Sequence, residues 1–177
     1  AFGASALEAL TTGFGNTAIG TGAGSGTNSG ASYNTFLGNG AGNAVSTTSF
    51  RTCVGYSANS GYDGSTCIGY ATADNAGYAT LVGHTATTSV TASYTVAVGQ
   101  GAATVHHSAV AVGAGSRAFG IGTVAVGRST GASSSTGAVN NTFLGYNSGY
   151  SLTTGTDSTF VGCNAGSSII TTGSNNT

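Results

Sequence analysis

Charged side chains are almost missing from this sequence. Of its 177 residues only 4% are charged, and the formal net charge is −1, whereas an average domain carries roughly 25% charged residues. Without a basic patch there is no electrostatic footprint for nucleic acid or for anionic lipid. The four scattered carboxylates offer no convincing pair for acid–base catalysis. We therefore expect neither an enzyme nor a nucleic-acid-binding protein.

Proline, methionine and tryptophan are absent, whereas glycine is abundant with 32 residues. Collagen needs proline and a glycine at every third position, so the sequence excludes that class. Disorder would need low hydrophobicity and high net charge, but 39% of the residues are apolar, and the chain is expected to fold. No apolar run approaches the roughly 20 residues that span a bilayer, so we expect no membrane insertion.

A five-residue phrase recurs along the chain: a polar residue, then Thr or Val, two apolar residues and Gly. Residues 141–145 (NTFLG) and 158–162 (STFVG) are two examples. Self-similarity at a regular spacing is typical of repeat architectures. By subtraction, neighbouring closing glycines lie 14 to 18 residues apart. The closing glycines are Gly3, Gly20, Gly38, Gly55, Gly69, Gly83, Gly99, Gly113, Gly127, Gly145 and Gly162.

The repeats fall into zones of different length. We predict a single repetitive β-solenoid segment over residues 1–177, with 14-residue core repeats at about 56–127. Longer repeats of 17 and 18 residues occupy about 1–55 and 128–177, and their extra residues are expected to bulge as loops. Both ends cut through a repeat, and neither an initiator Met nor a signal peptide is present. We therefore expect the chain to be a fragment of a longer fibre.

Each phrase predicts a short strand, because β-branched residues favour strands. The glycine then permits a positive φ or a close approach of two backbones. The third residue after each glycine is always small, which suits a crowded position where coils stack. These patterns predict an all-β protein, a parallel β-solenoid of about eleven coils, in which a 14-residue coil has two short strands and two corners.

Two adjacent apolar positions determine the expected quaternary structure. Neighbouring residues of a strand point to opposite faces, yet the last two residues before each closing glycine are both apolar. One of them fills the inside of the coil. The other forms a stripe along the stack, and large contiguous apolar patches are rare on soluble monomers. A 14-residue coil also encloses little core, so we expect an obligate oligomer of parallel chains.

The repeats carry a family resemblance. Residues 96–99, 110–113 and 124–127 all read VAVG, 14 residues apart, with a small residue three positions after each glycine. They resemble the head repeats of trimeric autotransporter adhesins, and the variant at 141–150 (NTFLGYNSGY) resembles repeats of phage and large-virus fibre proteins. The resemblance covers essentially the whole chain and implies a homotrimeric, left-handed β-roll.

The resemblance implies that the protein functions as a rigid fibre shaft or as an adhesive head. It also implies a location on a cell surface, on a virion or elsewhere outside the cell. The implied partners are further copies of the same chain and a host-surface receptor or glycan. A bacterial surface adhesin head is an alternative. An ice-binding solenoid is another, because threonines recur in register at Thr17, Thr35, Thr52, Thr66 and Thr80. Against it, valine takes this place in the VAVG repeats, and the place shares its face with the apolar residue before each glycine, so we expect the ladder to be buried.

The three cysteines are Cys53, Cys67 and Cys163. Cys53 and Cys67 occupy the same register one 14-residue repeat apart, so they are expected to stack on adjacent rungs. They are interpreted as small buried apolar side chains, and a disulfide between the rungs stays open as an alternative. No set of Cys and His at zinc spacing accompanies them, and we expect neither a metal nor a cofactor.

Other candidate residues have structural interpretations. Residues 113–118 and 120–125 match a relaxed dinucleotide-binding fingerprint, but that motif needs a following helix and here a strand phrase follows. The histidines, His84, His106 and His107, are expected at the solvent or at an interface. Exposed tyrosines after the glycines either stack on neighbouring rings or offer a face to glycans: Tyr56, Tyr70, Tyr146 and Tyr150.

Overall fold

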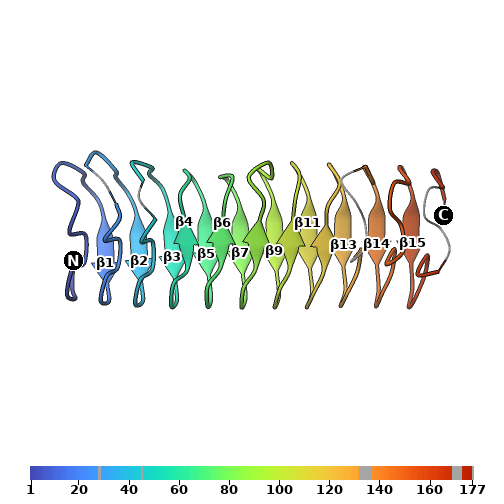
Figure 1. Cartoon of the computed structure of the whole chain (residues 1–177), viewed down its shortest axis with the longest axis horizontal. Coiled ribbons are helices and arrows are strands. Elements are labelled where there is room, and N and C mark those ends of the chain that lie inside the picture. The colour runs from blue at the N-terminus through green and yellow to red at the C-terminus, as the bar shows by residue number, and fades with distance from the viewer. Residues whose placement is uncertain (28, 45, 132–136, 169–172, 177) are drawn as a thin grey trace.

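The chain folds as a stack of coils along one axis. The computed structural model describes residues 1–27, 29–44, 46–131, 137–168 and 173–176. Within these residues the protein is all-β, without a helix, and successive turns of the chain lie side by side along a rod (Figure 1). The predicted parallel β-solenoid is therefore confirmed. No described segment forms a helix long and apolar enough to cross a membrane.

One parallel sheet of ten strands runs along the whole stack. Each strand has three residues, ends directly before a closing glycine, and pairs with the equivalent residues of the next coil. Phe2 adds a further rung through a single bridge to Ile19. The strands are β1 (Thr17–Ile19), β2 (Thr35–Leu37), β3 (Thr52–Val54), β5 (Thr66–Ile68), β7 (Thr80–Val82), β9 (Val96–Val98), β11 (Val110–Val112), β13 (Val124–Val126), β14 (Thr142–Leu144) and β15 (Thr159–Val161).

A second parallel sheet is confined to the middle of the stack. It coincides with the predicted 14-residue repeats, where each coil has two strands and two corners. In the longer repeats, the described residues form turns and loops in place of the second strand, apart from a single parallel bridge between Thr27 and Ser46 (Figure 1). The five strands have two residues each: β4 (Asn59–Ser60), β6 (Ala73–Asp74), β8 (Thr87–Thr88), β10 (Ala103–Thr104) and β12 (Arg117–Ala118).

The interior of the coil is narrow and is filled by one side chain per strand. In all ten strands of the long sheet the middle residue is buried, and its two neighbours point outward. Phe36 and Phe143 are the largest of these middle residues. The small residue three positions after a closing glycine lines the same interior, and Ala41 and Ala102 are fully buried there. The predicted packing role of the small residues is confirmed.

Backbone geometry requires the closing glycines. Gly99 has a φ of +133°, and a Cβ atom there would lie 2.6 Å from the carbonyl oxygen of Gly113 in the next coil. An L-residue neither adopts this φ readily nor fits into this space. The glycine therefore allows neighbouring coils to approach to the strand spacing of about 4.8 Å.

A second corner of the coil places ordinary residues at positive φ. The residue five positions before a closing glycine takes the left-handed conformation, with φ values of 58° at Tyr33, 60° at Phe50 and 52° at Tyr78. The backbone N–H of this residue donates to a carbonyl oxygen of the preceding coil, at 2.9 Å for Tyr33 and 3.0 Å for Tyr78. Hydrogen bonding between coils thus offsets the unfavourable backbone conformation, and the side chains at this corner form a column along the rod.

Two charged side chains of the described residues, Arg51 and Asp74, are buried in the coil. Arg51 is fully buried, and burial lowers the pKa of its guanidinium. Its Nε donates to Oδ1 of Asn34 at 3.2 Å, and its Nη2 donates to the hydroxyl of Thr27 at 3.1 Å. Its Nη1 donates to the carbonyl oxygen of Ser60 at 2.7 Å, and the guanidinium lies 4.9 Å from the ring centre of Phe36. These contacts replace the hydrogen bonds to water that the cation loses when it is buried.

Asp74 is the second buried charge. Its carboxylate accepts hydrogen bonds from the hydroxyls of Ser60 at 3.0 Å and Thr88 at 2.9 Å, and from the backbone N–H of Gly77 at 3.1 Å. Ser60 therefore bonds to Arg51 through its carbonyl and to Asp74 through its hydroxyl. A polar network that includes these two charges thus links neighbouring coils in the middle of the rod.

Candidate functional site

The outer face of the ten-stranded sheet carries two parallel columns of side chains. The first residue of each strand is Thr or Val, and the third is Ile, Leu or Val. Both lie outside the coil because only the middle residue is buried. The third-residue column is therefore an apolar stripe on the surface of the single chain, with exposed fractions of 46% at Ile19, 47% at Leu144 and 64% at Val161.

The stripe is continuous along the rod. In-register pairing places Ile19 beside Leu37 and Val54 beside Ile68, one side chain per coil. Ten strands at about 4.8 Å per step give the stripe a length of roughly 43 Å. The prediction that both faces of each strand are apolar is therefore confirmed, and one of these faces meets the solvent in the single chain.

The threonine column runs next to the apolar stripe. Thr17, Thr35 and Thr80 are exposed, and Thr52 and Thr66 are half-buried. In the three VAVG coils valine occupies the same place, so the column is not threonine throughout. As predicted, the threonines share their face with the residue before each closing glycine.

Cys53 and Cys67 stack on adjacent rungs, as predicted. They pair in register between β3 and β5, both are fully buried, and both thiols are free. The neighbouring Cys53 thiol, together with burial, raises the pKa of the Cys67 thiol, and the Cys67 Sγ donates to the carbonyl oxygen of Asn59 at 3.2 Å. Cys163 is exposed. The structure therefore shows two buried thiols and one accessible thiol.

The tyrosines that follow closing glycines stack on their neighbours. The ring centres of Tyr56 and Tyr70 lie 5.4 Å apart with nearly parallel planes, and Tyr70 stacks on His84 at 4.8 Å. Tyr146 lies under the guanidinium of Arg128 at 5.5 Å. The four tyrosines are exposed, as expected, and the stacked rings of Tyr56 and Tyr70 face neighbouring coils.

The remaining sequence candidates are not brought together. His107 is exposed and His106 is half-buried, and its enclosed Nε2 atom has no hydrogen-bond partner among the residues that the structure describes. Among the described residues, no three His, Cys, Asp or Glu side chains gather closely enough to hold a metal ion. The two glycine-rich fingerprints run into strands β12 and β13 and not into a helix.

A second aromatic column was missed from the sequence. Tyr33 stacks on Phe50 with ring centres 5.3 Å apart, and Tyr78 stacks on Tyr94 at 5.1 Å. All four residues lie at the left-handed corner, five positions before a closing glycine. This constant offset is the sequence signal that could have identified the column.

Comparison of the chain with protein-family models, with curated proteins and with solved structures gives no match in any of the three. The resemblance to adhesin and fibre repeats therefore stays a prediction from the sequence. Any functional conclusion depends on the geometry of the coil, above all on its outer apolar stripe and its aromatic columns.

Proposed function

We propose that this chain is a segment of a structural fibre or attachment protein, outside the cell or on a virion. Parallel copies associate along the outer apolar stripe and form a rigid shaft or adhesive head. The observation that carries this proposal is the third-residue column, because it places an aliphatic side chain on the surface of every coil.

Association along the stripe is favourable for a simple reason. The stripe residues are exposed toward both ends of the rod and half-buried in most of the middle coils, so that their burial contributes roughly 0.5 to 1 kcal/mol per coil. Because the stripe is straight and repeats with the coil, an identical parallel chain presents the same spacing and matches it along its whole length. A larger number of coils therefore gives a more stable assembly.

Rigidity follows from the hydrogen bonds along the rod axis. From Gly20 onward, the backbone N–H of each closing glycine donates to the preceding coil, for example Gly38 to Ile19 and Gly99 to Val82, both at 2.8 Å. Bending the rod would have to stretch such bonds in several coils at once. A rod with few charged residues and a narrow core is better suited to a role as a rigid spacer than to catalysis.

The proposed number of chains is three, and this number comes from the resemblance of the repeats. Sedimentation equilibrium or native mass spectrometry tests it directly. A homotrimer has three times the chain mass of 16.8 kDa. A stable folded monomer at low micromolar concentration would reject the association, and a dimer or tetramer would retain the association but reject the number three.

Ice binding is the second candidate, because the exposed threonines Thr17, Thr35 and Thr80 stand on a regular sheet face. The fibre is favoured because the neighbouring column is aliphatic and because valine replaces threonine in β9, β11 and β13. A thermal-hysteresis assay separates the two. Ice binding requires this sheet face to be exposed to solvent, whereas association of parallel chains in the proposed fibre would bury it. A bacterial adhesin head would differ from a viral fibre in the regions of the full-length protein that anchor it.

A further inference from the structure

The aromatic column at the left-handed corner has a gap. Along successive coils the position five before the closing glycine is occupied by Tyr33, Phe50, Gly64, Tyr78 and Tyr94. Rings stack in contact on both sides of the gap, at 5.3 Å and 5.1 Å between centres. At Gly64 the backbone keeps the same left-handed conformation, with a φ of +67°, but there is no side chain to continue the stack.

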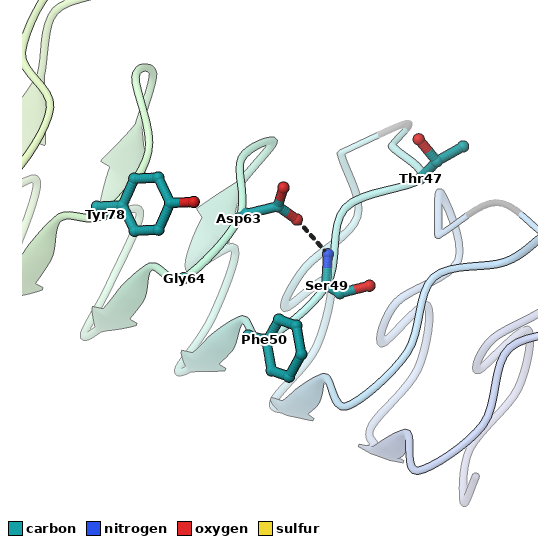
Figure 2. A pocket seen from close by; sticks show the side chains of 6 residues that line it. All are labelled: Thr47, Ser49, Phe50, Asp63, Gly64 and Tyr78. Atoms are coloured by element: carbon teal, nitrogen blue, oxygen red, sulfur yellow. Dashed lines mark hydrogen bonds between the residues drawn. The ribbon is translucent and has the colours of Figure 1, made fainter.

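A cavity of about 440 Å³ opens at this gap. Figure 2 shows Phe50 and Tyr78 on either side of Gly64, with the carboxylate of Asp63 at the rim. The lining residues are Thr47, Ser49, Phe50, Asp63, Gly64 and Tyr78. The volume lies within the range of about 300 to 1,000 Å³ that is usual for small-molecule sites.

The spacing of the walls suits one ring. Phe50 and Tyr78 belong to coils two steps apart, which corresponds to a separation of about 9.6 Å. A six-membered ring midway between them would lie about 4.8 Å from each wall, the same step that separates neighbouring coils. The fibre therefore leaves space for one guest ring in an aromatic stack.

The polar groups at the rim have unused hydrogen-bonding capacity. Asp63 Oδ1 accepts the backbone N–H of Ser49 at 2.6 Å, and within the described residues Oδ2 accepts no hydrogen bond. The Ser49 hydroxyl accepts the backbone N–H of Ser32 at 3.0 Å, which leaves its own proton available. The rim thus offers both an acceptor and a donor next to the aromatic walls.

The charge at the site favours a neutral guest. Two aromatic walls and a carboxylate would also suit a quaternary ammonium ion. However, the buried Arg51 lies close enough for its charge to interact with that of Asp63. Because Arg51 partly balances the carboxylate, a neutral ring with several hydroxyl groups matches the site better than a cation does.

We propose that the gap at Gly64 binds one pyranose ring of a glycan, with the faces of the sugar against Phe50 and Tyr78 and its hydroxyls on Asp63 and Ser49. All of these residues belong to one chain. The site does not depend on the association proposed for the outer stripe, and failure of one proposal leaves the other intact.

Saturation-transfer NMR on the whole chain tests the site, with the methyl glycosides of glucose, galactose and N-acetylglucosamine as probes and tetramethylammonium as the competing class. We expect transfer from the protein to the ring C–H protons of at least one glycoside. In Phe50→Ala the affinity should fall about tenfold, which corresponds to the loss of one aromatic wall. Asp63→Asn should also weaken binding, because it removes the charged acceptor. The amide retains an oxygen that can accept the hydrogen bond from the backbone N–H of Ser49.

The sharpest variant is Gly64→Tyr, which fills the gap. Tyrosine is tolerated at this corner, since Tyr33 and Tyr78 occupy it with φ values of 58° and 52°. Gly15→Tyr is the matched control, because it lies in the same column three coils away. A Cβ atom at either glycine would lie 2.8 Å from a ring carbon of the next tyrosine, which must turn aside in both variants.

Binding that is lost in Gly64→Tyr and retained in Gly15→Tyr would support the proposal. Binding that is equal in both variants would overturn it, as would the absence of transfer to all three glycosides. Tetramethylammonium binding that disappears in Gly64→Tyr, without glycoside binding, would overturn it in favour of a cation site. Circular dichroism establishes that each variant is folded, and Phe50→Ala provides an independent test at an exposed position.

Discussion

The guanidinium of Arg51 donates a hydrogen bond of 2.7 Å to the carbonyl oxygen of Ser60, joining the residue before β3 to strand β4 through the interior of the coil. Two further hydrogen bonds reach Asn34 and Thr27, so that each of the three guanidinium nitrogens has a hydrogen-bond partner. The middle of the rod is therefore stabilised by a polar network as well as by apolar packing.

Replacing Arg51 should destabilise the fold strongly. Arg51→Ala leaves a cavity and removes the donor to Ser60, and we expect the free energy of unfolding to fall by about 3 kcal/mol. Arg51→Met keeps most of the volume and should cost less. Urea unfolding at a fixed protein concentration measures both. Arg128→Ala is the control, since Arg128 is exposed and contacts Tyr146. An equal loss for Arg51→Ala and Arg128→Ala would contradict the role given to the buried network.

Substituting two glycines of one coil compares the cost of a steric clash between coils with the cost of a left-handed backbone conformation. Gly99→Ala brings a Cβ atom into the backbone of the next coil at 2.6 Å, and we expect a loss of about 3 kcal/mol in unfolding free energy. At Gly101 nothing lies within 4 Å of a Cβ atom, and φ is +63°, so that Gly101→Ala should cost about 1 kcal/mol. Thermal unfolding of the two variants gives the comparison. A similar cost at both positions would mean that neighbouring coils can move apart.

The three cysteines should react in two distinct phases. Cys163 is exposed, whereas Cys53 and Cys67 are fully buried, and the pKa of the Cys67 thiol is raised. Because the thiolate is the reactive form, we expect one thiol to react with Ellman's reagent in the native protein and all three after unfolding in urea. In Cys163→Ser the fast phase should disappear. More than one fast thiol in the native protein would show that the interior of the coil opens readily.

Charge on the outer stripe should dissociate the proposed assembly. Ile68→Asp and Leu144→Asp place carboxylates on the surface that parallel chains would bury, and each should weaken association at least about tenfold. Ala103→Asp is the control because it lies at the outward-facing first position of β10, in the second sheet. Sedimentation velocity compares the three variants. Unchanged association in both stripe variants would exclude this face as the contact between chains.

Much of the coil could be predicted from the sequence, because two strong constraints repeat in every turn. The glycine column requires both a positive φ and close contact, so few other residues are compatible with it. Strand alternation then places Phe36 and Leu37 on opposite faces, and the structure shows that Phe36 is the one inside. The predicted stacking of Cys53 on Cys67 follows from the same register.

The buried arginine and the aromatic gap could not be predicted in this way. The residue before each strand was interpreted only as polar, and its burial results from the left-handed corner that precedes it. That corner is hidden in the sequence because ordinary residues such as Tyr33 and Phe50 occupy it as well as Gly64. The gap becomes a cavity only when neighbouring coils are placed at their true spacing.

The in-register stacking of the long sheet also has an evolutionary consequence. Each strand pairs only with the coil before it and the coil after it, so that duplication or deletion of one complete turn leaves every other pairing intact. Recombination between such turns can therefore lengthen or shorten the protein in single steps without a new fold. The same recombination can also change the position along the rod of a feature that occurs in one coil, such as the gap at Gly64.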